Sequence, residues 1–558
     1  ANEAGVRLAR YPDRMGVFTT DKELALDIGK FGVEVGLTMK NLPAIVLNYD
    51  RDFKQGTKSR LSWSRVYFGS GNNDHFGLAP SWENIDEITD SFNVKVSDSF
   101  KEFNWKAEQH WEYTRAKHSR NVTYLSSESA PAASHTEVID YKNQPRSNLI
   151  MTTLGLDRWF MKDKVYASGG YRFSEVDNWD IMNVLLLKPD GTFLPGSNVI
   201  ASPATNRLVT QTWVGCLMTT LFNPLSIIGK VKIEEAHRRG EATRATDSDT
   251  DGLINSYTVS DNTDKISRLG ESISLRYSGI PRVALYNDYE FEQNHNNVFK
   301  NFVSGNSRIY YQDINDQFIG SGTIGARIIP WNQVTLTIQD RYKREDNGYD
   351  RPLISGSPLR LIDAQAITSD EATLGVAWKP NRYFQPAFRY QLVDMVYKVA
   401  CPRTPDYFDE ADQLSNVYTW DLTSLPTDQL LLNASFSMTD GKATTTNRYV
   451  STIASAPTFN FDSYTTLFSA SYSVNKDVTL IGTADYTRAV NFNDFSSVSV
   501  PLGADFHQAD MTFGCRWQVR KDFTLEPKFG WYTYQANEAE VGSFTAQTYF
   551  LEGKMKWG

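Results

Sequence analysis

Hydrophobic and polar side chains alternate strictly between residues 511 and 532. One set of alternate positions is apolar or aromatic and comprises Met511, Phe513, Cys515, Trp517 and Val519, followed by Phe523, Leu525, Pro527, Phe529 and Trp531. The intervening positions are small, polar or charged. A two-residue repeat is typical of β-strands, because successive side chains project to opposite faces of the strand. The charged residues between the two runs predict a tight turn, so this stretch is expected to form a β-hairpin with one apolar and one polar face.

The same layout of strand, tight turn and strand recurs along the chain. The turns carry Pro, Asn, Asp, Gly or Lys, of which the first four favour chain reversal. They are expected at residues 98–102, 162–163, 223–224, 279–281, 330–332, 380–381 and 475–477. Longer segments rich in Ser, Asn, Asp, Thr and Gly separate the hairpins, at residues 68–87, 117–147, 176–208, 238–268, 294–315, 345–369 and 398–427. Short turns are therefore predicted to alternate with long loops.

This pattern predicts about 22 strands. We place them at residues 31–40, 43–53, 58–67, 88–97, 103–116, 148–158, 164–175, 209–220, 224–237, 270–278, 282–293, 316–329, 333–344, 370–379, 383–397, 428–438, 442–452, 463–474, 477–489, 506–519, 523–534 and 544–557.

Composition narrows the classes of protein that such a pattern can represent. The 558 residues carry a formal net charge of −9 and include 13% aromatic side chains. No basic block dominates any region, which argues against nucleic acid as the main partner. No window approaches the 18 or more apolar residues that a membrane helix requires. If the chain crosses a membrane, it is expected to do so with strands.

The last residues point to such a membrane protein. Alternate positions place Tyr549, Leu551, Gly553, Met555 and Trp557 on one face of the final strand. Here the chain resembles outer-membrane β-barrel proteins, whose last strand alternates in this way and ends at or beside an aromatic residue; Gly558 after Trp557 is a small departure. The resemblance implies an all-β, transmembrane, antiparallel up-and-down barrel of about 22 strands (20–26) in the outer membrane of a Gram-negative bacterium. It also implies short periplasmic turns and long extracellular loops, and the alternative is a large soluble β-protein.

Two regions are expected on this basis. Residues 1–30 form a periplasmic N-terminal segment, and residues 31–558 form the barrel. Barrels of 22 strands carry a plugged lumen, and a segment of about 30 residues is too small for a globular plug. Either the long loops fold into the lumen, or another protein fills it.

Charged residues on the polar face of the predicted strands are the candidate lumen-facing residues. They are Lys230, Lys232, Glu234, Asp288, Glu290, Arg341, Arg389, Asp485, Glu526 and Lys528. Charges of both signs are tolerated on such a wall when water or a polar protein lies against it. No ring of a single sign stands out, so the sequence predicts no ion-selectivity filter.

Two hairpins carry a second resemblance. The stretches "VNKDVTLIGTADYTR" and "IPWNQVTLTIQDRYKRED" are similar to hairpins of the large barrels in porin–cytochrome electron conduits. That resemblance implies a sheath around a periplasmic multihaem c-type cytochrome, with an extracellular cytochrome as a further partner. The chain has no C-x-x-C-H motif, so it has no haem cofactor of its own and any haem belongs to the partner. It also lacks the N-terminal CxxC of some members.

Two other functions remain open from the residues alone. One is a solute-conducting porin whose lumen is constricted by inward-folded loops. The other is a surface-binding barrel that acts through its long loops. We expect no enzyme activity and name no catalytic residue, because no nucleophile or phosphate-binding motif is apparent.

An acidic stretch, "DSDTDGLINSYT", suggests a calcium site in a predicted external loop. Asp247, Asp249 and Asp251 have the spacing of the first ligands in a Ca²⁺-binding loop. The twelfth position is Thr258 and not the glutamate that completes an EF-hand. These aspartates are therefore candidate ligands of a low-affinity Ca²⁺ site, and the alternative is a solvated acidic loop.

Overall fold

The structure is a computed structural model of the chain. It describes residues 25–40, 42–67, 74–123, 125–126, 138–187, 192, 198–247, 249, 253–305, 307–354, 363–400, 410–445, 458–493, 505–536 and 543–555.

The secondary structure elements of this part of the chain are all β-strands. In chain order they are β1 (Leu26–Leu37), β2 (Ala44–Tyr67), β3 (Asp74–Phe100), β4 (Phe103–Thr123), β5 (Leu125–Ser126), β6 (Val138–Asn143), β7 (Arg146–Phe160), β8 (Val165–Leu187), β9 (Asn198–Phe222), β10 (Leu225–Asp247), β11 (Ser256–Ile280), β12 (Val283–Ser304), β13 (Ser307–Trp331), β14 (Val334–Ile354), β15 (Ala364–Trp378), β16 (Gln385–Ala400), β17 (Glu410–Thr427), β18 (Leu430–Thr445), β19 (Phe459–Ser473), β20 (Val478–Val490), β21 (Phe506–Arg520), β22 (Phe523–Ala536) and β23 (Phe544–Met555).

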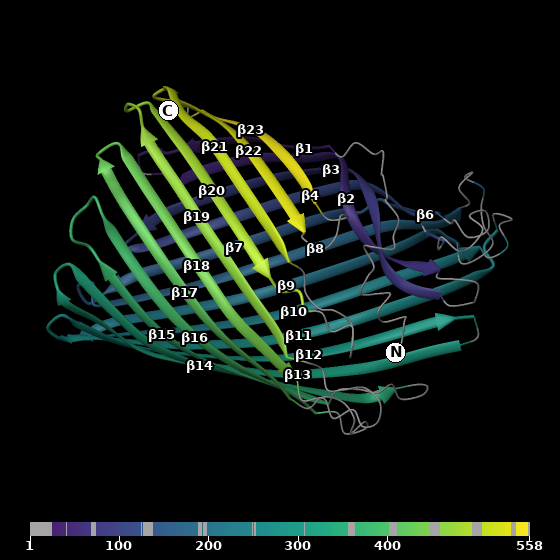
Figure 1. Ribbon diagram of the computed structural model, residues 1–558. Helices are drawn as coiled ribbons and strands as arrows, with labels where there is room; N and C mark the ends of the chain where they lie inside the picture. The colour runs from purple at the N-terminus through teal and green to yellow at the C-terminus, as the bar shows by residue number, and fades with distance from the viewer. Residues whose placement is uncertain are drawn as a thin grey trace.

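These strands form one sheet in which each long strand pairs antiparallel with its neighbours in the sequence (Figure 1). The total of 23 becomes 21 long strands when the two-residue β5 is set aside and β6 and β7 are taken as one interrupted strand. Both totals agree with the predicted value of about 22. The all-β, up-and-down architecture is confirmed.

A proline explains the interruption between β6 and β7. Both pair with β4 on one side and with β8 on the other, so they lie end to end. Pro145 stands at the break and has no N–H group to donate to a ladder. Its carbonyl still accepts a hydrogen bond from the Ala116 amide, at 2.9 Å, and the Gln144 amide donates to the Ile181 carbonyl at 3.3 Å. The wall therefore continues across the break.

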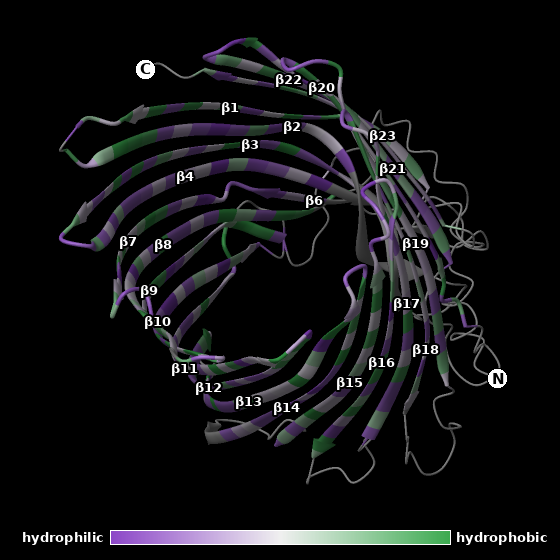
Figure 2. Ribbon diagram, turned by 90° about the vertical axis from the view of Figure 1, so that its left-hand side faces the viewer, coloured by the Kyte–Doolittle hydropathy of each residue, from purple (hydrophilic) through white to green (hydrophobic). Residues whose placement is uncertain are grey.

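The sheet curls round until its two end strands approach each other. β1 and β23 are in contact, although no ladder pairs them among the described residues. In a view turned by 90° from that of Figure 1, the strands form a curved wall around a wide interior (Figure 2). Because 21 strands alternate in direction, β1 and β23 run the same way along this wall.

Short turns gather at one end of the wall, as predicted (Figure 1). β9 ends at Phe222 and β10 begins at Leu225, so the predicted turn at residues 223–224 is confirmed. Two neighbouring turns at this end are joined by an ion pair between the Arg382 guanidinium and the Asp428 carboxylate, at 2.6 Å. A hydrogen bond with the Tyr383 hydroxyl and the charge of Asp428 raise the pKa of Arg382 above its ordinary value.

At the other end, the strands extend far into segments that were predicted as loops. β12 continues to Ser304 and β13 begins at Ser307, so the predicted loop at residues 294–315 is mostly a long hairpin. The expectation was wrong because polar composition was read as loop. A strand that rises beyond the lipid has water on its outer face, so both faces can be polar while the backbone ladder continues.

The predicted loop at residues 398–427 hides a strand that sequence reasoning missed. β17 occupies Glu410–Thr427 within it and pairs with β16 and β18. Leu414, Tyr418 and Trp420 alternate on one of its faces and were the available signal. Asn416 between them on the same face, and Ser415 and Asp421 on the other face, obscured that signal.

Two predicted reversals are continuous strands. The strands predicted at 43–53 and 58–67 are the single strand β2, in which Gly56 adopts a φ of +136° without reversing the chain. The strands predicted at 428–438 and 442–452 are likewise replaced by β18, which ends at Thr445, and residues 446–457 lie outside the described part. A glycine lies in each of the two gaps, Gly56 and Gly441, and glycine fits inside a strand when a neighbour approaches closely.

The barrel begins earlier than the predicted boundary at residue 31. β1 starts at Leu26, which pairs with Gly56 at mid-height of β2. Residues 26–30 therefore belong to the wall and not to a separate segment. Residues 1–24 lie outside the described part, and their periplasmic location stays a prediction.

Among the described residues, no helix is long and apolar enough to span a membrane.

Candidate functional site

The wall has two chemically different faces, and β10 illustrates both. Val231 and Ile233 project from one face and are 41% and 43% exposed. Lys230, Lys232 and Glu234 alternate with them and project from the other face. Figure 2 shows the same alternation as short bands of opposite hydropathy along many strands.

Apolar side chains are mostly exposed on the outer surface of the wall and few of them are buried. Only six apolar side chains are buried among the described residues: Ile85, Ala116, Val199, Ala236, Ala245 and Ala489. Large apolar side chains are instead exposed around the whole wall, including Phe513 at 59% and Trp517 at 46%. A protein in water rarely exposes so much contiguous apolar surface. This face therefore requires lipid, and the polar face encloses the lumen.

Neighbouring strands bring charges of both signs into rows across the lumenal face. One row runs from Lys230 on β10 through Ser272 and Glu290 to Ser321 and Lys343 on β14. Each member is directly opposite the next in the ladder register. Lysines thus flank a central glutamate, and no single sign dominates the row.

Glu234 is the centre of one ion-pair cluster on the lumenal face. Its carboxylate lies 3.0 Å from Lys232 Nζ and 2.8 Å from the Arg268 guanidinium. The Thr212 hydroxyl donates a third contact at 3.4 Å. Three strands therefore hold one carboxylate between two cations, while the lysine and arginine remain exposed to the lumen.

Asp288 forms an ion pair with a single cation on the next strands. The Arg276 guanidinium binds its carboxylate at 2.9 Å. Tyr286 is the next residue on the same face of β12 towards the short turns, and its hydroxyl donates to the Gln339 side chain at 3.0 Å. Arg341 lies opposite Thr323 and Glu371 on the same face.

A third cluster lies near the end of the sheet, on β21 and β22. The Glu526 side chain is only 9% exposed and accepts contacts from Lys528 at 2.6 Å and Arg516 at 3.1 Å. Its partner on β23 is Glu552, which is opposite it in the register and is paired with Lys554 at 3.1 Å. The cluster therefore places three cations and two carboxylates on three adjacent strands.

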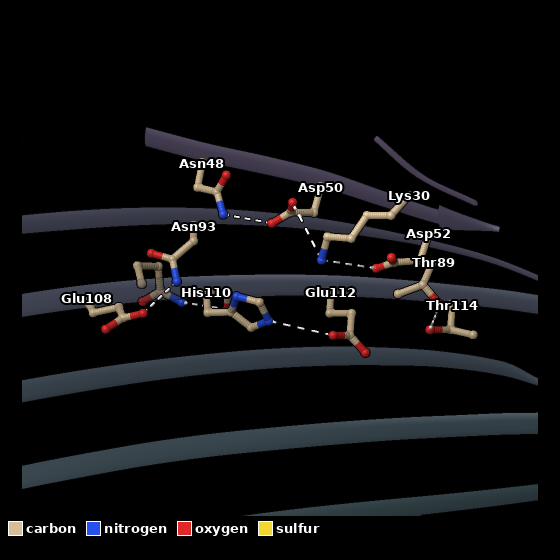
Figure 3. Close-up of polar contacts among 11 residues, drawn as sticks. Lys30, Asn48, Asp50, Asp52, Thr89, Asn93, Glu108, His110, Glu112 and Thr114 are labelled. Carbon is tan, nitrogen blue, oxygen red and sulfur yellow. Dashed lines mark hydrogen bonds and ion pairs between the residues drawn. The ribbon is translucent and has the colours of Figure 1, made fainter. Parts of the chain in front are cut away.

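The structure also shows a lumenal cluster on β1 to β4, in which sequence reasoning missed Lys30, Asp50 and Asp52 but expected His110 on the inward face beside Glu112 (Figure 3). Lys30 Nζ lies 3.7 Å from Asp50 and 3.8 Å from Asp52. His110 Nε2 lies 3.8 Å from the Glu112 carboxylate on the same face. The alternation of β2 was the signal that could have found the aspartates. Leu47 marks the lipid face of this strand, and Asp50 and Asp52 lie at positions of the opposite face. The arginine that interrupts that apolar face at residue 51 made the signal weak.

The ten predicted lumen-facing residues all lie on strands, on the polar face of the wall. Lys230, Lys232 and Glu234 are brought together, as are Glu526 and Lys528. Asp288 and Glu290 share β12 and lie near Arg341 across β13. The other two stand apart: Arg389 is opposite Thr419, and Asp485 is opposite Asp510. Their assignment to the lumen follows from the apolar character of the opposite face.

The candidate calcium ligands are only partly described. Asp247 is buried at the end of β10, and the Asp249 amide donates to its carboxylate at 3.2 Å. The Asn255 side chain donates to Asp249, also at 3.2 Å. Asp251 lies outside the described residues. No group of three or more potential ligands is arranged to hold a metal within the described ranges, and the calcium site stays a prediction.

Comparison with known proteins identifies the fold. No family model matches the chain, and no curated protein matches its sequence. The ferric yersiniabactin uptake receptor FyuA from Yersinia pestis is structurally similar, with a TM-score of 0.52 and 9% identity over 96% of this chain and 80% of the receptor. The ferripyoverdine receptor of the outer membrane of Pseudomonas aeruginosa gives 0.51 and 12% identity, over 96% and 72%. The copper transporter OprC gives 0.50 and 10% identity, over 96% and 80%.

At such identities the comparison speaks for the fold alone. It agrees with what the exposed apolar face requires, namely lipid around a curved wall of antiparallel strands. The chain is a large antiparallel β-barrel with the fold of the outer-membrane receptors it resembles, and its exposed apolar face suits a membrane.

Proposed function

We propose that this barrel forms a transmembrane passage whose lumen is occupied by a soluble protein partner, a periplasmic multihaem c-type cytochrome. The single observation that carries the proposal is the lumenal wall, on which cations and anions are interspersed and several are held in ion pairs. In this function the barrel insulates electron transfer across the outer membrane, and the haems belong to the partner.

The charge pattern suits a protein occupant. Soluble proteins expose both signs of charge, and interfaces match positive groups with negative groups. In the Glu234 and Glu526 clusters, the carboxylates are enclosed while lysines and arginines remain exposed on their edges. Such groups can exchange partners with a protein surface at small energetic cost, because they stay within a polar environment.

The width of the barrel favours an occupant over free solute. Barrels of 16–18 strands already leave an aqueous channel, and wider ones carry a plugged lumen. Selective ion passage usually employs a ring of one sign, which the rows from Lys230 to Lys343 do not form. The hairpins at residues 329–346 and 474–488 add the resemblance to barrels of electron conduits.

The proposal is tested by purifying the protein in mild detergent from its native outer membrane. The visible absorption spectrum and the subunit composition are then measured on the same sample. We expect a strong c-type Soret band and a second chain in stoichiometric amount. A colourless, solitary barrel with ion conductance in a planar bilayer would support a porin instead.

A receptor is the second candidate, and the structural neighbours favour it. They are a ferric yersiniabactin uptake receptor, a ferripyoverdine receptor and a copper transporter. The long strand extensions opposite the short turns offer a surface on which such a ligand could bind. Binding of a metal complex by the colourless barrel, lost when the β12–β13 extension is removed, would support this candidate.

A further inference from the structure

A hollow of about 440 Å³ lies on the lipid-facing side of the wall, where β7 to β10 approach the loop end. Its lining includes three arginines from three strands, Arg146 on β7, Arg207 on β9 and Arg239 on β10, together with the aromatic side chains Tyr113 and Trp179. All three arginines are exposed. They alternate with polar-face residues, so they point away from the lumen.

The hollow sits at the edge of the apolar surface. Outward-facing apolar positions end at Ile150 on β7, Val209 on β9 and Ile233 on β10. The arginines follow within the next few outward positions of the same strands. Aromatic residues that line the hollow are typical of membrane interfaces, where one side of the ring meets hydrocarbon and the other meets water. The hollow is therefore at the level of the lipid headgroups of the outer leaflet.

The arrangement of the arginines favours the binding of an anion. Arg207 and Arg239 are directly opposite each other in the β9–β10 register. Like charges in such positions destabilise a sheet. Carboxylates offset part of this repulsion: Arg207 lies 2.6 Å from Glu175 and 3.7 Å from Asp177, and Arg239 lies 2.6 Å from Glu241.

These ion pairs orient the guanidinium groups and leave some of their N–H donors available. Each guanidinium has five N–H donors in a planar fork, and one or two carboxylate contacts leave donors available. Arg146 is held differently, because its guanidinium stacks over the Trp179 ring at 5.1 Å. Three oriented guanidiniums around one hollow match the oxygens of a phosphate, which arginine binds in bidentate fashion.

We propose that this hollow binds the phosphate group of an outer-leaflet lipid, with Arg146, Arg207 and Arg239 as its ligands. The acyl chains of that lipid would lie along the apolar face below, over Ile150 and Ile233. The inference does not depend on what occupies the lumen. It requires only that the barrel stands in the outer membrane.

The test measures binding of lipid A to the detergent-purified barrel by native mass spectrometry. Bisphosphorylated lipid A, dephosphorylated lipid A and inorganic phosphate are titrated separately. We expect the bisphosphorylated lipid to bind wild-type protein and the triple variant R146Q/R207Q/R239Q to bind it at least about tenfold more weakly, because charge-assisted hydrogen bonds are lost. The dephosphorylated lipid should bind both proteins equally weakly.

Arg344→Gln is the matched control, since Arg344 is an outward-facing arginine beside a carboxylate, Asp346, on the distant strand β14. It should bind lipid A as the wild type does. If the triple variant fails to fold, Arg239→Gln alone should still weaken binding several-fold, and Arg239→Lys should restore part of it. Equal binding by variant and wild type overturns the proposal, as does inorganic phosphate binding as tightly as the lipid.

Discussion

At the scale of single residues, position on one face or the other decides what a side chain experiences. Phe513 and Thr512 are adjacent in β21, yet one projects to the exposed apolar face and the other to the polar face opposite Thr483. Val231 and Lys232 are likewise adjacent in β10 and project to the apolar and the polar face, respectively. Side-chain chemistry is therefore constrained separately at odd and even positions.

Placing a charge at each of these neighbours tests the facing directly. Phe513→Arg should lower the free energy of unfolding in lipid vesicles by about 2–4 kcal/mol, because a cation would enter the bilayer near its midplane. Thr512→Arg should leave it nearly unchanged, since the new charge would meet the lumen. Urea titration followed by tryptophan fluorescence measures both, and equal losses would contradict the assignment of the faces.

Removing the charge of Glu526 tests whether lumenal ion pairs stabilise the wall. Glu526→Gln leaves Lys528 and Arg516 without their shared carboxylate, so we expect unfolding to become easier by about 1–3 kcal/mol. Glu552→Gln is the control, because its partner Lys554 is exposed and exposed pairs contribute about 0–1 kcal/mol. Equal effects at the two positions would show that the partly enclosed pair at Glu526 has no special role.

At the scale of elements, single residues decide where strands bend and where they continue. Pro145 breaks β6 from β7 without ending the wall, and Gly56 keeps β2 continuous at a φ of +136°. A Cβ atom at Gly56 would lie 2.1 Å from the Ala25 carbonyl oxygen. Close approach of the chain before β1 therefore requires glycine there.

Substitution at Gly56 should destabilise the junction of β1 and β2. Gly56→Ala introduces both a clash with Ala25 and an unfavourable φ, and we expect a loss of about 1–3 kcal/mol in unfolding free energy. Gly36→Ala is the control, because a Cβ atom at that position meets nothing within 4 Å. If both variants unfold at the same urea concentration, the close approach at Gly56 does not constrain the fold.

The strand extensions should be separable from the membrane wall. Residues 298–313 form the far part of the β12–β13 hairpin, and Asn297 is opposite Ile314 in the register. Replacing 298–313 with a two-residue Asn-Gly turn should preserve assembly, since such turns suit a two-residue hairpin. Heat-modifiable migration on gels and circular dichroism check the result, and loss of the folded band would show that the extension is needed for assembly.

At the scale of the whole molecule, an outer apolar surface and an inner charged surface coexist because the sheet curls round until its two end strands come into contact. The barrel buries very few apolar side chains among its described residues, so its stability depends on backbone ladders and on lipid. The width that 21 long strands create is what makes the charged wall relevant to a large occupant.

The sequence by itself determined which residues share a face, because the two-residue period of a strand is a local property. Most short turns followed from it, and it is also the basis on which the ten candidate wall positions are assigned to the lumen. Tertiary structure decided where strands end and which charges meet. β17 and the β12–β13 extension were read as loops because polar strands outside lipid lack the apolar signal, and only the ladder with neighbouring strands reveals them. The Glu234 cluster and the meeting of Arg146 with Arg207 and Arg239 depend on register between strands that are tens of residues apart, which no local pattern encodes.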